Sequence, residues 1–269
     1  MEPGAVDYIQ LTPWDLGLAA VLLIIPALIS IALKLGLEKS LAIASIRTVV
    51  QLAFLGLILE WVFTADRWFY VVPMLGVMLF FAARAGIQRS SRRFRGSYLA
   101  AFGALALATS VTTFSVTEVI LDVDNWYEPQ YVIPLLGMLL GNGLTGISLG
   151  LDRMLSDMTT QRRAIEARLA VGASLWKACL PWVREGLRNG MIPIINSMMI
   201  VGLVSLPGMM TGQILAGVPP ADAVAYQILI MFMIAAATAL GVIVLCLIAF
   251  RVISHPEERV RWTAITRHD

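Results

Sequence analysis

The stretch VAYQILIMFMIAAATALGVIVLCLIAFRV, residues 224–252, decides the class of fold. Its only charged residue, Arg251, lies next to its end. A helix needs about 20 consecutive apolar residues to cross the hydrocarbon core of a bilayer. This stretch is therefore predicted to be a transmembrane helix.

The composition of the whole chain points the same way. Of 269 residues, 58% are hydrophobic and 14% are charged, and the mean hydropathy is +0.79. An ordinary soluble domain carries roughly 25% charged residues. This chain has too little charge to coat a soluble domain, which excludes a soluble globular enzyme and a disordered chain. The net charge of +2 gives no reason to expect a nucleic-acid partner.

Seven runs of this kind recur along the sequence. We expect an all-α, polytopic membrane helical bundle with seven transmembrane helices, forming one permease-like domain over residues 1–269. The first run is not expected to be a cleaved signal peptide, because its upstream flank is acidic and no small-x-small site closes it. The runs cover about 14–33, 41–62, 68–87, 97–119, 131–151, 190–206 and 224–252.

Basic residues are distributed unevenly between the predicted loops. Loops after the first, third and fifth runs, together with the tail, hold 18 of the 20 lysine and arginine residues. The exceptions are Arg47, inside the second run, and Arg67. Because basic loops stay in the cytoplasm, we expect the N-terminus outside and the C-terminus inside.

The longest predicted cytoplasmic segment covers about residues 152–189. Within it, RRAIEARLAVGAS (162–174) is amphipathic, with Ile165 and Leu169 one turn apart. Gly172 suits a helix stop, and Ser174 suits the N-cap of the next helix. The pattern predicts a short helix across the end of the bundle, either as a solvated surface helix or as a docking helix for a cytoplasmic partner.

The sixth run is interrupted. Residues 190–218 contain Pro193, Pro207-Gly208, Gly212 and Gly217 within an apolar sequence. Such breaks are tolerated where protein or a water-filled path satisfies the freed backbone groups, and they often line transport sites. A packing kink is the alternative interpretation.

Polar side chains within the spans are candidates for a transport path. Arg47 lies inside the second run with Gln51 one turn further, although a long arginine side chain can also extend to the headgroups. Asn142, Thr145 and Ser148 in the fifth run either line a path or join helices. Glu60 and Glu118, with Asp122 and Asp124, form an acidic outer mouth or lie as ordinary headgroup-level acids.

Metal-binding residues are harder to assign. Cys179 and Cys246 are too few for a thiolate cluster, and both histidines lie near the C-terminus. Four methionines surround the sixth-run break, where thioethers suit soft metals but also serve as apolar filler. They are Met198, Met199, Met209 and Met210. The metal ligands, if any, stay unknown.

Several motifs resemble the FetB family of ATP-binding-cassette (ABC) permeases, which includes bacterial iron exporters and plant aluminium-tolerance permeases. The most specific is GLVSLPGMMTGQILAG (202–217), followed by Tyr226-Gln227. Glu166-Ala167 and Gly172-Ala173-Ser174 resemble the EAA-x-x-x-G coupling loop of ABC importers, with Arg168 in place of the second alanine. The likeness covers roughly residues 40–235. It also includes Arg47 and Gln51, Pro134, Gly137, Met138, Gly141 and Asn142, and Leu169.

This resemblance implies a permease subunit of the bacterial inner membrane that exports iron or another metal ion. It also implies a homodimer, a cytoplasmic ABC ATPase partner, and ATP and Mg²⁺ bound on that partner with no cofactor on this chain. Its implied coupling residues are Ile165, Glu166, Ala167, Leu169, Gly172 and Ala173. Its implied path residues are Arg47, Gln51, Asn142, Ser205, Pro207, Gly208, Met209, Met210 and Gln227.

Other functions fit the sequence less well. None of the three lysines follows a glycine, so no phosphate-binding loop for ATP is expected. An ion-coupled secondary transporter is the main alternative, although the carboxylates cluster near the span ends.

A retinal protein would need a lysine in residues 224–252, and an intramembrane protease would need paired catalytic groups. Gly146-x-Ser148-x-Gly150 matches a nucleophile elbow, but small-residue helix packing explains it better.

Overall fold

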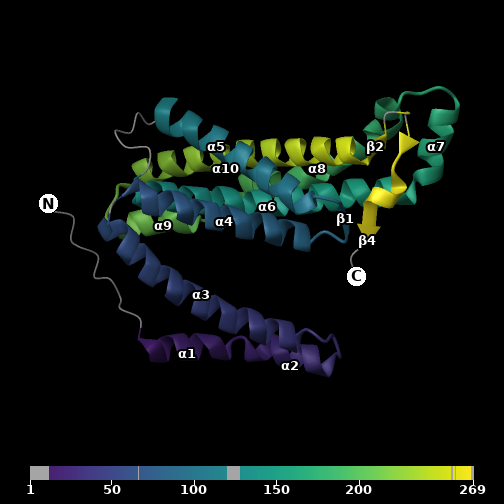
Figure 1. The fold of residues 1–269 in the computed structure, drawn as a ribbon. Helices are drawn as coiled ribbons and strands as arrows, with labels where there is room; N and C mark the ends of the chain where they lie inside the picture. Colours follow the sequence, from purple (N-terminus) through teal and green to yellow (C-terminus); the bar gives the residue numbers. More distant parts are fainter. Residues whose placement is uncertain (1–11, 66, 120–127, 256, 258, 268–269) are drawn as a thin grey trace. The chain divides into compact units, whose positions relative to one another are not determined.

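The computed structural model describes residues 12–65, 67–119, 128–255, 257 and 259–267, and it is overwhelmingly helical (Figure 1). Six helices in this part of the chain are long and apolar enough to cross a membrane. The predicted membrane helical bundle is therefore confirmed, whereas the count of seven spans stays a prediction. The candidate spans are Trp14–Ala32, Glu38–Thr64, Trp68–Gln88, Ser97–Val116, Pro129–Thr160 and Pro220–Ile253.

The chain packs as two compact units, residues 1–66 with 215–217 and residues 67–214 with 218–269. The expectation of one domain over the whole length stays a prediction. In the first unit the predicted run 14–33 is two helices, α1 (Pro13–Val21) and α2 (Ile24–Ala32). The hydroxyl of Ser30 donates to Glu38 over 2.9 Å, which links the end of α2 to the start of α3 (Glu38–Ala65).

The second unit contains the remaining elements. Its membrane-length helices lie side by side in Figure 1, with α6 in contact with α4, α5, α8 and α10. The helices are α4 (Trp68–Gln88), α5 (Ser97–Val119), α6 (Pro129–Thr160), α7 (Arg162–Ala170), α8 (Leu175–Ile200), α9 (Gly208–Leu215) and α10 (Pro220–Ile253). Four short strands and one 3-10 turn complete it: β1 (Arg92–Phe94), β2 (Ser254–His255), β3 (Arg259–Val260), η1 (Trp262–Ala264) and β4 (Ile265–Arg267).

Glycines join α6 to α8 at the centre of this unit. A Cβ atom on Gly190 would lie 2.8 Å from the carbonyl oxygen of Gly146, and one on Gly186 would lie 2.8 Å from that of Gly150. Backbone therefore meets backbone along a seam of two G-x-x-x-G motifs, an arrangement that small residues permit. The expected close packing at Gly146 and Gly150 is found within the chain, and its partner is the pair Gly186 and Gly190.

The helix α8 differs from the sequence expectation. It begins at Leu175, well before the predicted run 190–206, and continues for 26 residues. Leu175, Cys179 and Val183 are buried in the main core, so this early part is held by packing on one face despite its charged outer face. The backbone of Ser174 is extended at the N-cap as expected, although its side chain makes no capping hydrogen bond.

Segments far apart in sequence meet at the end of the unit that carries α7, which we call the α7 end. The C-terminal strand β4 pairs antiparallel with β1, with Phe94 opposite Ile265. A second pair, β2 with β3, folds the chain back beyond α10. The tail therefore packs against the bundle rather than leaving it (Figure 1).

Candidate translocation site and docking helix

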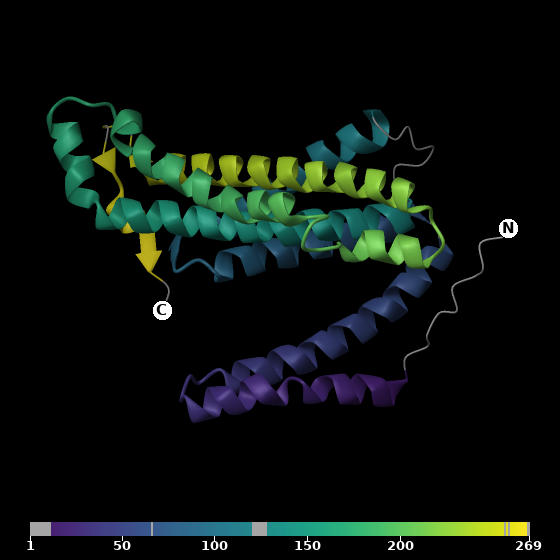
Figure 2. The same cartoon turned by 180° about the vertical axis from the view of Figure 1, so that it is seen from behind.

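The break between α8 and α9 is a compact turn. The carbonyl oxygen of Ile200 accepts hydrogen bonds from the amides of Leu203 and Val204, at 3.2 and 3.0 Å. Gly202, with φ of +80°, donates to the carbonyl of Ser205 over 2.9 Å. Much of the turn's hydrogen bonding is thus internal. Figure 2 shows this turn as the green loop between α8 and α9.

A cavity of about 540 Å³ adjoins the turn. Its lining is mostly apolar, with the methionines Met198, Met210 and Met231 and one amide, that of Gln227. Gln227 is only 7% exposed, and its Oε1 atom accepts no hydrogen bond within the described part of the chain. A buried polar atom without a partner costs about 1–3 kcal/mol, so this covered oxygen is an unused acceptor in a residue that lines the cavity.

A second cavity, of about 220 Å³, lies beside the same helices. Met209 and Tyr226 line it, whereas their neighbours Met210 and Gln227 line the first. On each of α9 and α10, two consecutive residues therefore line different cavities. Of the predicted path residues, Pro207, Met209, Met210 and Gln227 are brought together here.

Other predicted path residues lie elsewhere. The amide of Asn142 donates to the carbonyl of Met138 over 2.9 Å within α6, so it is engaged in its own helix. Ser205 lies in the turn and Gly208 begins α9, and neither residue lines either cavity. Arg47 and Gln51 are exposed residues of α3 in the first unit.

The predicted outer acidic mouth is only partly within the described residues. Glu60 is exposed on α3. The side chain of Glu118 and residues Asp122 and Asp124 lie outside the described part of the chain. Among the described residues, no group of three or more histidine, cysteine, aspartate or glutamate side chains could hold a metal ion.

The short helix α7 lies at the opposite end of α8 from the break. Ile165 is fully buried in the core, so it anchors the helix instead of facing outward. Leu169 and Ala173 pack against the same core. Glu166 and Ala167 are exposed, and Val171 just beyond the helix is 85% exposed. Gly172 has φ of +87°, a conformation that favours glycine, and turns the chain toward α8.

The C-terminal tail forms one wall of a cleft beside α7. The cleft has a volume of about 290 Å³ and is lined by Arg162, Glu166 and Leu169 from α7 and by Arg259, Val260 and Trp262 from the tail. The guanidinium of Arg162 lies over the ring of Trp262 and also forms an ion pair with Glu166 at 2.7 Å. Arg168 lies over the ring of Trp182 on α8, with 5.1 Å between Cζ and the ring centroid.

The sequence of residues 13–253 matches the family described as "Uncharacterised protein family (UPF0014)". This chain belongs to the UPF0014 family. It is 31% identical to "Probable iron export permease protein FetB" of Escherichia coli, over 90% of this chain and 92% of that protein. It is 34% identical to "UPF0014 membrane protein YjkA" of Bacillus subtilis, over 91% of this chain and 94% of that protein. With "Protein ALUMINUM SENSITIVE 3" of Arabidopsis thaliana it shares 33% identity, over 82% of this chain and 80% of that protein. No solved structure matches this UPF0014 member.

Three residues at the α7 end of this UPF0014 member were not predicted from the sequence to be part of a site. Trp262 and Arg259 of the tail line the α7 cleft, and Val171 is the most exposed apolar residue of the α7 segment. The alternation of charged and apolar residues in RVRW (259–262) was the one available signal for the tail.

Proposed function

We propose that this UPF0014 member is the membrane-spanning permease subunit of an ABC transporter. The observation that carries the proposal is the continuity of α8, a single helix from the turn after α7 to the break beside the Gln227 cavity. A displacement of α7 would pass through the short turn 171–174 into α8 and reach the cavity along that one helix. An ATP-driven permease needs such a link between its docking element and its path.

In this proposal α7 is the docking helix. Its outward residues Ala167, Val171 and Gly172 form a small apolar tip, and the exposed arginines Arg163 and Arg168 flank it. Such a tip suits a partner cleft that is apolar at its centre and acidic at its rim. With basic loops in the cytoplasm, α7 and the C-terminus would face the cytoplasm and the N-terminus would lie outside. The proposed location is the bacterial inner membrane.

The proposed motor is a separate cytoplasmic ATPase subunit. None of Lys34, Lys39 and Lys177 follows a glycine, so the chain carries no phosphate-binding loop of the usual pattern. ATP and Mg²⁺ would therefore be bound by the partner, and this chain would need no cofactor. Two copies of the permease would work with two ATPase subunits.

The proposed cargo is a metal ion, with iron supported by the name of the Escherichia coli relative. The residues that line the cavity at the break include Gln227, which carries a neutral amide oxygen, and the thioether residues Met198, Met210 and Met231. Neutral ligands hold a cation weakly, which suits passage better than storage. Arg47, Gln51 and Asn142, and an outer mouth at Glu60 and Glu118, remain proposed parts of the path.

Co-purification with the ATPase tests the assignment. The permease expressed with a candidate ABC ATPase should yield a stable complex whose ATP hydrolysis differs from that of the isolated ATPase. Val171→Asp should weaken the complex, because it places a charge on the tip that would enter the apolar centre of the partner's cleft. A chain that binds no ATPase, or a Val171→Asp variant that binds as well as the parent, would contradict the docking assignment.

A further inference from the structure

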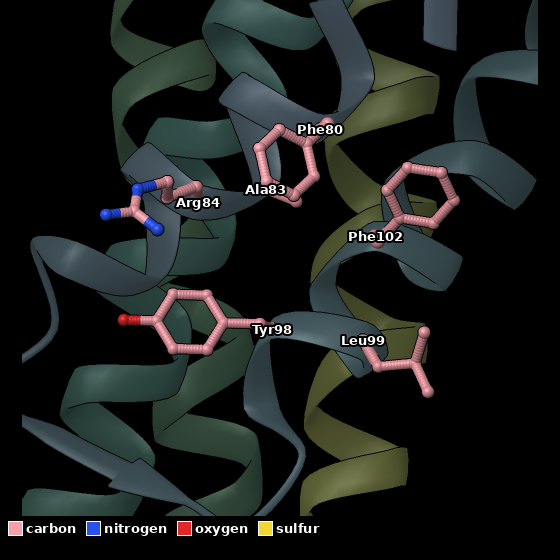
Figure 3. A pocket seen from close by; sticks show the side chains of 6 residues that line it. All are labelled: Phe80, Ala83, Arg84, Tyr98, Leu99 and Phe102. Atoms are coloured by element: carbon pink, nitrogen blue, oxygen red, sulfur yellow. The ribbon is translucent and has the colours of Figure 1, made fainter. Parts of the chain in front are cut away.

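An amphipathic groove lies between the last turns of α4 and the first turns of α5. It has a volume of about 420 Å³ and is lined by Phe80, Ala83, Arg84, Tyr98, Leu99 and Phe102 (Figure 3). In Figure 3 the guanidinium of Arg84 and the hydroxyl of Tyr98 lie toward one side, and Phe102 and Leu99 lie toward the other. The groove therefore has a polar end and an apolar end.

Positive charge at the polar end is unbalanced. Within the described residues, Arg84 forms no hydrogen bond or ion pair, and none of the six lining residues is acidic. A second guanidinium, that of Arg93, donates to the hydroxyl of Tyr98 over 2.9 Å and lies over its ring. Arg93 is itself held by the carbonyls of Ile87 and Gln88, at 3.1 and 3.2 Å, so this end of the groove is organised without any ligand.

The position of the groove along the candidate spans also suits a lipid. Arg84 lies in the last turns of one candidate span and Tyr98 in the first turn of the next, which places both near headgroup level. Phe80 and Phe102 lie one turn deeper along the same helices. Basic pockets between transmembrane helices at this level bind anionic headgroups.

We propose that this groove binds one anionic phospholipid. Its phosphate pairs with Arg84 and accepts from the hydroxyl of Tyr98, and an acyl chain lies along Phe80, Leu99 and Phe102. A phosphate supplies the counter-charge that Arg84 lacks, whereas an apolar protein surface packed here would bury that guanidinium unpaired at a large cost. This proposal is independent of the transport function and of the direction in which the chain spans the membrane.

Lipid binding to the purified full-length chain tests the proposal. Native mass spectrometry would measure retention of phosphatidylglycerol against phosphatidylcholine of the same chains. Arg84→Gln should lower phosphatidylglycerol affinity about tenfold, which corresponds to about 1.4 kcal/mol, and Arg84→Lys should retain most of it. Tyr98→Phe should give a smaller loss, because it removes one donor and keeps the ring.

The matched control is Arg89→Gln. Arg89 is exposed at the C-cap of α4, a little over one turn from Arg84, and does not line the groove. The same loss of charge there should leave phosphatidylglycerol affinity unchanged. Equal losses of phosphatidylglycerol affinity in Arg84→Gln and Arg89→Gln would overturn the proposal, because they would show general attraction between a basic surface and an anionic lipid. A change in oligomeric mass in Arg84→Gln, with lipid retention unaltered, would overturn it in favour of a second copy of the chain.

Discussion

The Cζ atom of Arg162, the first residue of α7, lies 5.2 Å from the centre of the Trp262 ring in the C-terminal tail. The tail continues from Trp262 into β4, which pairs with β1 between α4 and α5. The proposed docking helix is therefore tied to the α4–α5 connection as well as to α6 and α8. Movement of α7 would be shared by both pairs of helices.

Trp262→Ala should loosen α7. An exposed cation–π contact contributes about 0.5–1 kcal/mol, and the ring also covers one wall of the α7 cleft. Amide hydrogen exchange in residues 162–170 should become faster, and the amount of cargo moved per ATP should fall. Trp262→Phe keeps an aromatic face and serves as the control. Unchanged exchange in Trp262→Ala would show that the tail does not restrain α7.

Gly190→Ala should destabilise the bundle. The added Cβ would lie 2.7 Å from Val242 and 2.8 Å from the carbonyl of Gly146, so α6, α8 and α10 would have to move apart. Overpacking of this kind costs about 1–3 kcal/mol, which should lower the Tm in detergent. Gly103→Ala is the control, because a Cβ there meets nothing within 4 Å. An equal Tm for the two variants would contradict the glycine seam.

Gln227→Leu should abolish transport without lowering the stability of the protein. Removing a buried oxygen that has no partner should leave the free energy of unfolding unchanged or raise it by up to about 1–3 kcal/mol, yet transport should be lost. Thr238 provides the control, since its hydroxyl is also buried and without a partner in the described part of the chain. Thr238→Val should gain stability and keep transport. Full transport by Gln227→Leu would remove Gln227 from the path.

Cys179 should make stability depend on pH in the alkaline range. Burial raises the pKa of this thiol from its ordinary value of 9.0 to about 12, so the unfolded chain loses the proton first. Its contribution to stability is complete below pH 9 and is lost as the pH rises from about 9 to 12. Cys179→Ala should flatten this part of the curve of Tm against pH. The native thiol should also resist N-ethylmaleimide at pH 8, and rapid labelling there would contradict its burial.

Local patterns in the sequence predicted much of the α7 end. The short helix after α6 and the turn at Gly172 follow from amphipathic periodicity and one glycine. A helix starting after Ser174 was predicted, but its continuity with the run 190–206 was not, because its outer face carries Lys177, Arg184 and Arg188, which lowers its hydropathy below that of a span. Only packing on the core shows that this charged face belongs to a continuous helix.

Long-range partners could not be predicted from one sequence. Pro207-Gly208 located the break approximately, but the turn begins earlier, at Val201 and Gly202. The convergence of Met210 and Gln227 on one cavity depends on how α9 packs beside α10. The pairing of β1 with β4 joins residues more than half the chain apart, and no local pattern specifies such a pair.

Transport by the reconstituted chain tests the central claim most directly. Liposomes would contain the permease alone, with the active ATPase subunit, or with an ATPase variant that binds ATP without hydrolysing it, and movement of ⁵⁵Fe²⁺ would be followed with and without ATP. The account predicts movement of the metal only with ATP and the active ATPase. Transport by the permease alone, driven by a proton or sodium gradient without ATP, would contradict it and identify an ion-coupled transporter.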